Sequence, residues 1–344
     1  MPASAESGKP AGRHGHTFPF APFAALVVLL VFACAAGAAF GSSSVSVGDL
    51  FALVIGGEID PTASNILVNV RLPRVGAAVL AGSALGCAGA IIQGALDNPL
   101  ASPNVIGINS GAGLAVLLAS SLAPRTWALF PLAAFVGAVA TAALVFAIAM
   151  RAGSSKIVVV LAGMALTALF GAGMNAVLII DPDAYIGASG FLVGGLSGVQ
   201  AQSLAFPAAY IAVGFIAAVP VASRLNTLSL GDGISHSLGM NVPLARMASL
   251  AVAAVLAGAA VSFAGLLGFV GLIVPHVMRA FVGHDHRLLL PASALAGAGF
   301  VTLCDLLARV LFAPYELPVG ILMAALGGPF FIFLVLRRWG RDAW

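Results

Sequence analysis

Long apolar stretches, separated by short polar segments, run through almost the whole chain. Ten stretches of roughly 17 to 24 residues can be distinguished, and a helix of about 20 apolar residues crosses a hydrocarbon core of roughly 30 Å. The stretches cover residues 19–40, 75–96, 105–123, 127–150, 157–180, 203–222, 247–264, 266–282, 288–311 and 318–336. The pattern predicts an all-α polytopic membrane protein with about ten transmembrane helices.

The composition agrees with this class of protein. Hydrophobic residues make up 61% of the chain and charged residues only 8%, whereas soluble domains carry about 25% charged residues. The formal net charge of +3 is too small to indicate a nucleic-acid partner. A soluble domain and a nucleic-acid-binding protein are therefore both excluded.

The chain begins with a polar segment that is followed directly by an apolar run. Residues 1–17 are polar and predict a disordered cytoplasmic tail. The apolar run that follows is about 22 residues long, which exceeds the 7–15 apolar residues of a secretory signal. We therefore expect a retained first span and one transmembrane domain over residues 18–344.

The basic residues indicate how the helices are oriented. An even number of spans places both termini on one side, and cytoplasmic segments carry an excess of Lys and Arg. Cytoplasmic termini put eleven basic residues inside and four outside, namely Arg71, Arg74, Arg125 and Arg309. The sequence thus predicts cytoplasmic termini.

Three of the outer arginines lie at the ends of apolar segments, against this bias. They are Arg71, Arg74 and Arg309. One explanation is that their side chains reach toward lipid phosphates. The alternative is an acidic partner that arrives from outside.

Each half of the chain contains a span that adjoins a helix-breaking polar turn, at Asn98-Pro99 and at Pro275-His276. Within a membrane, broken backbone must lie against protein or line a water-filled path. Paired interrupted spans are typical of transporters whose two halves meet at the path. We assign six residues to such a path: Gln93, Asn98, Pro99, Ser102, Pro275 and His276.

The longest predicted cytoplasmic connection covers residues 224–243. Its glycines bound a short amphipathic piece, which suits docking into a cleft on another protein, although resting at the lipid interface is an alternative. The residues we expect to take part are Leu228, Gly231, Asp232, Ser237, Leu238 and Gly239.

Catalytic motifs are missing from the sequence. It contains no phosphate-binding Gly-x-x-x-x-Gly-Lys-Ser/Thr motif, no His-Glu-x-x-His and no nucleophile elbow. The His284-Asp285-His286 turn favours a solvated loop over a metal site, and the three cysteines form no metal or disulfide pattern. Ionisable residues are nearly missing from the predicted spans, with Asp305 as the main exception. This scarcity argues against a proton-coupled transporter.

A series of ordered motifs runs from about Val45 to Arg338. The motifs are Arg71-Leu-Pro-Arg74, Gly89 with Gln93, Asn98-Pro-Leu-Ala101 with Pro103, Gly107 through Gly111-Ala112, Ser237-Leu-Gly239, Gly268 to His276 with Arg279, Asp305 with Arg309, Glu316-Leu-Pro-Val-Gly320 and Gly328-Pro-Phe-Phe331. They resemble those of the FecCD family, the permease subunits of ATP-binding-cassette (ABC) importers for iron-siderophores, haem and cobalamin. One departure is Asp97, where many relatives carry a basic or other polar residue.

This resemblance implies a binding-protein-dependent importer in a bacterial inner membrane, with ferric siderophores as the first expectation and haem or cobalamin as the alternative. A stand-alone secondary transporter is the remote alternative. The chain itself is expected to bind no cofactor and to catalyse no reaction, because ATP and Mg²⁺ belong to a partner ATPase.

The family also implies particular partners. They are ABC ATPase subunits, a periplasmic or lipoprotein substrate-binding protein, a second permease copy or paralogue, and membrane lipid. By motif match, Arg71, Arg74 and Arg309 would dock on the binding protein, and the 224–243 loop would couple to the ATPase.

Overall fold

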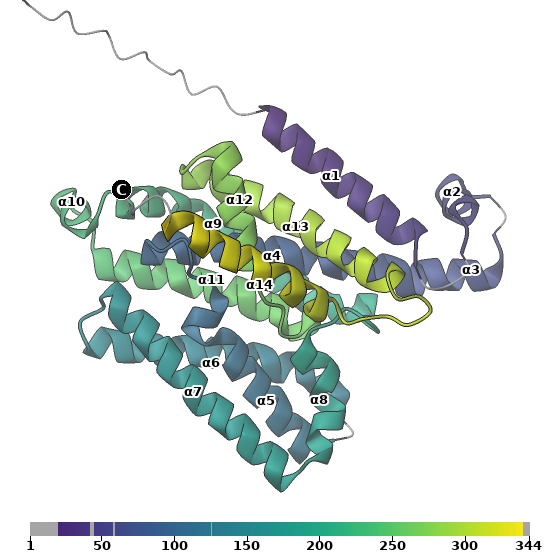
Figure 1. The fold of residues 1–344 in the computed structure, drawn as a ribbon, viewed down its shortest axis with the longest axis horizontal. Coiled ribbons are helices and arrows are strands. Elements are labelled where there is room, and N and C mark those ends of the chain that lie inside the picture. Colours follow the sequence, from purple (N-terminus) through teal and green to yellow (C-terminus); the bar gives the residue numbers. More distant parts are fainter. Residues whose placement is uncertain (1–19, 42–44, 58, 125, 340–344) are drawn as a thin grey trace, which may run out of the picture.

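The computed structural model describes residues 20–41, 45–57, 59–124 and 126–339, and helices joined by short connections make up this part of the chain (Figure 1). The predicted tail over residues 1–17 lies outside the described residues. The α-helices are α1 (Phe20–Ala39), α2 (Val47–Ile55), α3 (Pro61–Ile66), α4 (Leu72–Leu96), α5 (Ile108–Leu122), α6 (Phe130–Arg151), α7 (Lys156–Ile180), α8 (Asp183–Val193), α9 (Ala205–Leu228), α10 (Asp232–Ser237), α11 (Val242–Ala264), α12 (Val270–Val282), α13 (His286–Val310) and α14 (Val319–Trp339).

Seven helical segments of the described chain are long and apolar enough to cross a membrane. They are Phe20–Ala39, Pro61–Leu96, Trp127–Arg151, Lys156–Ile180, Ala201–Leu228, Val242–Ala264 and His286–Val310. Three shorter apolar helices occupy the remaining predicted stretches, at Ile108–Leu122, Val270–Val282 and Val319–Leu334. The all-helical membrane fold is thereby confirmed, and each predicted apolar stretch corresponds to one helix.

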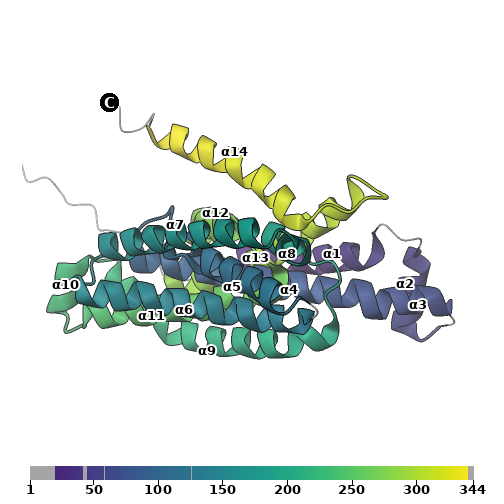
Figure 2. The same ribbon diagram turned by 90° about the horizontal axis from the view of Figure 1, so that it is seen from below.

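Helix α4 forms the centre of the bundle, surrounded by α9, α11, α12 and α13 (Figures 1 and 2). Small residues allow this burial, because they let neighbouring helix backbones approach closely. A Cβ atom on Gly82 would overlap the backbone of Gly297 in α13, and one on Gly89 would overlap the backbone of Gly271 in α12. Gly89 and Gly271, which both belong to the motifs, thus form a contact point between helices.

The second span begins earlier than the apolar pattern predicts. α3, a π-helical turn over Leu67–Arg71 and α4 form one continuous helical segment from Pro61 to Leu96. The short helices α2, α3 and α8 were not predicted, because none of them forms a long apolar run. Arg71 and Arg74 therefore lie within a helix rather than ahead of one.

The predicted interruption at Pro275 is wrong. Pro275 lies inside α12, and the break in this region comes earlier, where Gly265 and Phe269 have φ angles of 70° and 64°. A proline removes one hydrogen bond, to the carbonyl four residues before it. That carbonyl belongs to Gly271, and the Gln93 amide supplies the missing donor at 3.1 Å.

The helices run along a common direction, which gives the bundle two distinct ends. The start of α1 and the end of α14 point toward the end where α10 lies, whereas α2 and α3 extend from the opposite end (Figures 1 and 2). We call these the α10 end and the α2 end. The first and last described helices thus begin and finish on the same side, as an even number of spans requires.

The close approach of α4 and α12 can be tested with glycine replacements. Gly89→Ala should lower stability by about 1–3 kcal/mol, because its methyl group would overlap the Gly271 backbone. Gly76→Ala is the matched control in the same helix, since a Cβ there meets no described atom within 4 Å. That change should be neutral or stabilise by up to about 1 kcal/mol. Thermal unfolding in detergent compares the two, and equal melting temperatures would contradict the packing argument.

Candidate functional site

Helix α10 is a separate short helix between α9 and α11 at the α10 end of the bundle. Gly231 and Gly239 flank it with φ angles of 96° and 83°, which favour glycine. The connection is shorter than the predicted 224–243 loop, because α9 continues to Leu228 and α11 already begins at Val242. It is nevertheless built as a rigid projection rather than as an open loop.

The apolar side chains of this connection divide into two groups. Leu228 is buried in the core, whereas Leu230, Ile234 and Leu238 are exposed. Ser237 and Gly239 close the helix next to Leu238. The exposed group forms an apolar surface at the tip of the bundle, which is the kind of surface that a protein partner or a lipid interface covers.

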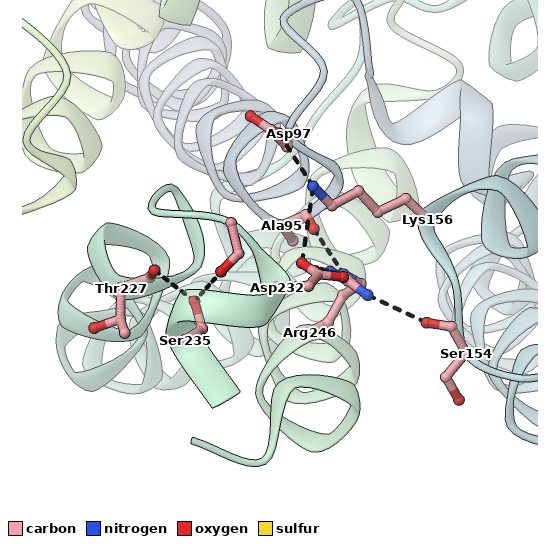
Figure 3. A network of polar contacts seen from close by, with 9 residues as sticks. Ala95, Asp97, Ser154, Lys156, Thr227, Asp232, Ser235 and Arg246 are labelled. Carbon is pink, nitrogen blue, oxygen red and sulfur yellow. Dashed lines mark hydrogen bonds and ion pairs between the residues drawn. The ribbon is translucent and has the colours of Figure 1, made fainter. Parts of the chain in front are cut away.

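Asp232 fixes α10 to the rest of the protein (Figure 3). Both of its carboxylate oxygens accept hydrogen bonds from Arg246 Nη2, at 2.7 and 2.8 Å. Arg246 is only 2% exposed, whereas the Asp232 side chain is 49% exposed. The Ser235 hydroxyl adds a second attachment by donating to the Thr227 carbonyl at 2.7 Å.

The Arg246 guanidinium also reaches two other elements (Figure 3). Its Nε donates to the Ala95 carbonyl in the last turn of α4 at 3.1 Å, and its Nη1 donates to the Ser154 carbonyl between α6 and α7 at 3.2 Å. Sequence reasoning missed this residue, counting it only among the inner charges. Its position beside the start of an otherwise apolar stretch was the available signal.

Lys156 makes a second connection in the same region. Its ammonium group lies 3.1 Å from an Asp97 carboxylate oxygen and 3.9 Å from one of Asp232. Asp97 ends α4 in the left-handed conformation, with a φ of 47°. The family departure at Asp97 therefore has a structural partner in this chain.

A cavity of about 340 Å³ opens beside this network. Four of the six predicted path residues line it, namely Gln93, Asn98, Pro99 and His276. Its other lining residues are Gly94, Asp97, Ser229, Arg279, His284 and His286. Ser102 and Pro275 lie outside this lining, so the structure brings together most but not all of the predicted set.

Gln93 joins α4 to α12 at the cavity. Its amide nitrogen donates to the Gly271 carbonyl, and its amide oxygen accepts a hydrogen bond from Arg279. Next to it, His276 packs edge-on against Phe330 of α14, with ring centroids 6.1 Å apart. The two polar residues thus connect α4, α12 and α14 at the end of the bundle.

The His284-Asp285-His286 turn is only partly solvated. His284 is exposed, but His286 is buried, and its Nδ1 lies 2.9 Å from the Asn226 amide oxygen. The pKa of Asp285 lies below its usual value. Burial raises this pKa, but hydrogen bonds from Asn226 and from the Arg287 amide, together with the Arg287 charge, lower it by more. No cluster of three metal-ligating residues occurs within the described chain.

At the α2 end, Arg71 and Arg309 close the end of α1. Arg71 Nη1 donates to the carbonyls of Ala38 and Ala39, at 2.9 and 2.7 Å. Arg309 donates to the carbonyls of Gly37 and Phe40, at 3.1 and 3.2 Å. Because the last carbonyls of a helix have no partner within the helix, these guanidinium groups satisfy them.

Beside Arg71, the other two arginines of this end, Arg74 and Arg309, pair with carboxylates. Asp305, which is buried, lies 3.0 Å from Arg74 and 3.1 Å from Arg309, and Glu316 lies 2.6 Å from Arg74. All three arginines are buried, whereas the Glu316 side chain is 30% exposed. Docking on a binding protein stays a prediction for these residues. In this structure they hold together α1, α4, α13 and the segment before α14.

A second cavity, of about 470 Å³, adjoins this arginine cluster, with Arg74 and Glu316 in its wall. Aromatic residues and glycine backbone form much of the remaining wall, including Trp127, Phe130 and Phe191. Sequence reasoning did not anticipate this cavity, because its walls come from segments far apart in the chain. The bundle is therefore hollowed at both ends.

Removing the shared carboxylate tests the arginine cluster. Asp305→Asn should lower stability by about 3 kcal/mol, since two buried guanidinium groups would lose a charged partner. Glu316→Gln should cost less than about 1 kcal/mol, because this carboxylate is partly exposed. Thermal unfolding of the two purified variants measures the difference. Equal loss in both would show that Asp305 has no special role.

Comparisons with known proteins agree with this architecture. The FecCD transport family profile matches residues 27–337. The hemin transport system permease protein of Yersinia pestis is 38% identical, over 91% of this chain and 94% of that protein. The Fe(3+)-citrate import system permease protein YfmE of Bacillus subtilis is 36% identical, over 90% of this chain and 92% of that protein.

Among solved structures, a metal-chelate type ABC transporter in an inward-facing conformation matches with a TM-score of 0.82 and 30% identity. The match covers 93% of this chain and 100% of the other. Sequence and structure thus agree over nearly the whole length of the chain. It belongs to the FecCD transport family, the permease subunits of ABC importers, which are not themselves enzymes.

Proposed function

We propose that this chain is the transmembrane subunit of an importer that carries a ferric siderophore across a bacterial inner membrane. Relatives are named for the transport of hemin, Fe(3+)-citrate and iron(3+)-hydroxamate, which supports iron chelates as the substrate class. Ferric siderophores lead within this class, with haem and then cobalamin as the alternatives. The substrate would approach from the α2 end and leave at the α10 end.

The single observation that carries the mechanism is the anchored helix α10. An exposed apolar tip, fixed by the buried Arg246, lies beside the cavity that holds Asn98 and Pro99. A partner that docks on this tip is in a position to act on the turn at the cavity. An ABC ATPase is the partner that the family implies.

The orientation follows from the charge distribution. The basic residues that the sequence places inside include Lys156, Arg246 and Arg279, all of which lie at the α10 end. By the excess of positive charge in cytoplasmic segments, the α10 end faces the cytoplasm. The seven long spans and three shorter apolar helices then make ten transmembrane helices with both termini inside.

The α2 end then faces the compartment from which the substrate comes. The cavity of about 470 Å³ there would receive the substrate from a periplasmic or lipoprotein binding protein. Its wall is mostly apolar, with Arg74, Glu316 and four serines as the polar part. A second copy of the chain, or a paralogue, would complete a central path between two subunits. A secondary transporter would need neither the ATPase nor the binding protein.

Reconstitution decides between these functions. The chain is purified with its partner ATPase and binding protein and is placed in liposomes. Ferric hydroxamate labelled with ⁵⁵Fe should enter only with ATP, ATPase and binding protein present, and ferric citrate, haem and cobalamin are compared in parallel. Uptake by the permease alone, without ATPase, would instead establish a secondary transporter. Uptake of haem or cobalamin alone would correct the substrate.

A further inference from the structure

We propose that the Asp232–Arg246 ion pair is the link through which movement of α10 reaches the turn at Asp97-Asn98-Pro99. Both residues would then be positioning residues for transport, acting on the cavity without touching the substrate. The inference rests on the proposed function, because it assigns the route by which an ATPase bound to α10 opens and closes that end of the path.

The geometry of the guanidinium group supports this route. Arg246 holds Asp232 through Nη2, the Ala95 carbonyl through Nε and the Ser154 carbonyl through Nη1. These three contacts leave from one planar, rigid group, so the three partners cannot move independently of one another. Ala95 lies two residues before Asp97, at the end of α4. Displacement of α10 therefore pulls on the last turn of α4 or breaks the pair.

The burial of Arg246 makes breakage the less favourable outcome. A buried guanidinium that loses its carboxylate is left as an uncompensated charge in an apolar surrounding. Asp232, by contrast, is half exposed on the surface of α10. The link thus joins a residue on the moving helix to one fixed deep in the bundle, as a rigid connection requires.

The two sides of α10 have different tasks in this arrangement. Ile234 and Leu238 are exposed to a partner, whereas Asp232 is directed toward Arg246 (Figure 3). The hydrogen bond from Ser235 to Thr227 attaches α10 to the end of α9, so the helix can turn as a unit with that end. A force applied by a partner to Ile234 and Leu238 would then reach Arg246 through Asp232.

Lys156 provides a parallel but weaker connection. It bridges Asp97 and Asp232 directly, but its distances of 3.1 and 3.9 Å join partly exposed groups. Exposed ion pairs contribute little, because water screens them. The arrangement therefore predicts a graded series in which changes at Asp232 or Arg246 have large effects and changes at Lys156 have small ones.

The test compares two rates in the same proteoliposomes that contain the complete complex. Uptake of ⁵⁵Fe-labelled ferric hydroxamate and hydrolysis of ATP are measured together, which gives the iron transported per ATP. Asp232→Asn keeps the size of the side chain and removes its charge. We expect this ratio to fall at least about fivefold, with hydrolysis that still responds to the binding protein.

Matched variants separate coupling from folding. Asp183→Asn makes the same chemical change in the first turn of α8, at the other end of the bundle, and should leave the ratio unchanged. Arg246→Lys keeps the charge but loses the three-way contact, and should reproduce the lowered ratio. Lys156→Met should change the ratio less than about twofold. If Arg246→Lys fails to fold, Asp232→Asn still decides, because the Arg246 hydrogen bonds to the Ala95 and Ser154 carbonyls remain in that variant and thermal unfolding checks that it is folded.

Each result supports or overturns the link. An unchanged ratio in Asp232→Asn overturns it while leaving the proposed function intact, since the wild-type complex still transports. A parallel fall of uptake and hydrolysis shows that the pair only holds the fold or the ATPase in place, which also overturns the link. ATP-dependent uptake that is missing in the wild type overturns the proposed function instead.

Discussion

In a bundle this apolar, the polar groups at helix ends must find partners within the protein, and arginine side chains supply many of them. Arg71 and Arg309 donate to the last carbonyls of α1, and Arg246 donates to the last turn of α4. Water satisfies such carbonyls in soluble proteins, but the hydrocarbon core of a membrane contains none. The positions of the helix ends are therefore fixed by buried guanidinium groups as well as by the connecting segments.

Helix α4 is held by arginine side chains at both ends of the bundle. At the α2 end, Arg74 ties its first turns to Asp305 of α13, and at the α10 end, Arg246 ties its last turn to Asp232. Between these points, glycines such as Gly82 and Gly89 bring it against the backbones of α13 and α12. Held at both ends in this way, α4 contributes to both cavities: Arg74 lines the one at the α2 end and Gln93 lines the one at the α10 end.

The sequence was sufficient to predict the spans but not the directions of individual side chains. The ten apolar stretches all became helices, because a long apolar run leaves the backbone no other way to satisfy its hydrogen bonds in lipid. The helices α2, α3 and α8 were missed, since none of them forms a long apolar run. Pro275 was misjudged for a different reason: Gln93, distant in sequence, replaces the hydrogen bond that the proline removes.

Charge counting shows the same limit at the candidate site. It singled out Arg71, Arg74 and Arg309 as exceptions to the inner excess of positive charge, and the structure brings all three together. Counting could not show that Asp305, Glu316 and the α1 carbonyls lie beside them, because these groups come from the other end of the chain or from a helix terminus.

An arginine at the α2 end of the bundle thus needs no external partner when neighbouring acids and carbonyls satisfy it. Glu316 is more exposed than Arg74, so a protein that approaches this end meets a carboxylate before it meets the guanidinium. Docking through these arginines therefore requires them first to exchange their internal partners for those of the incoming protein.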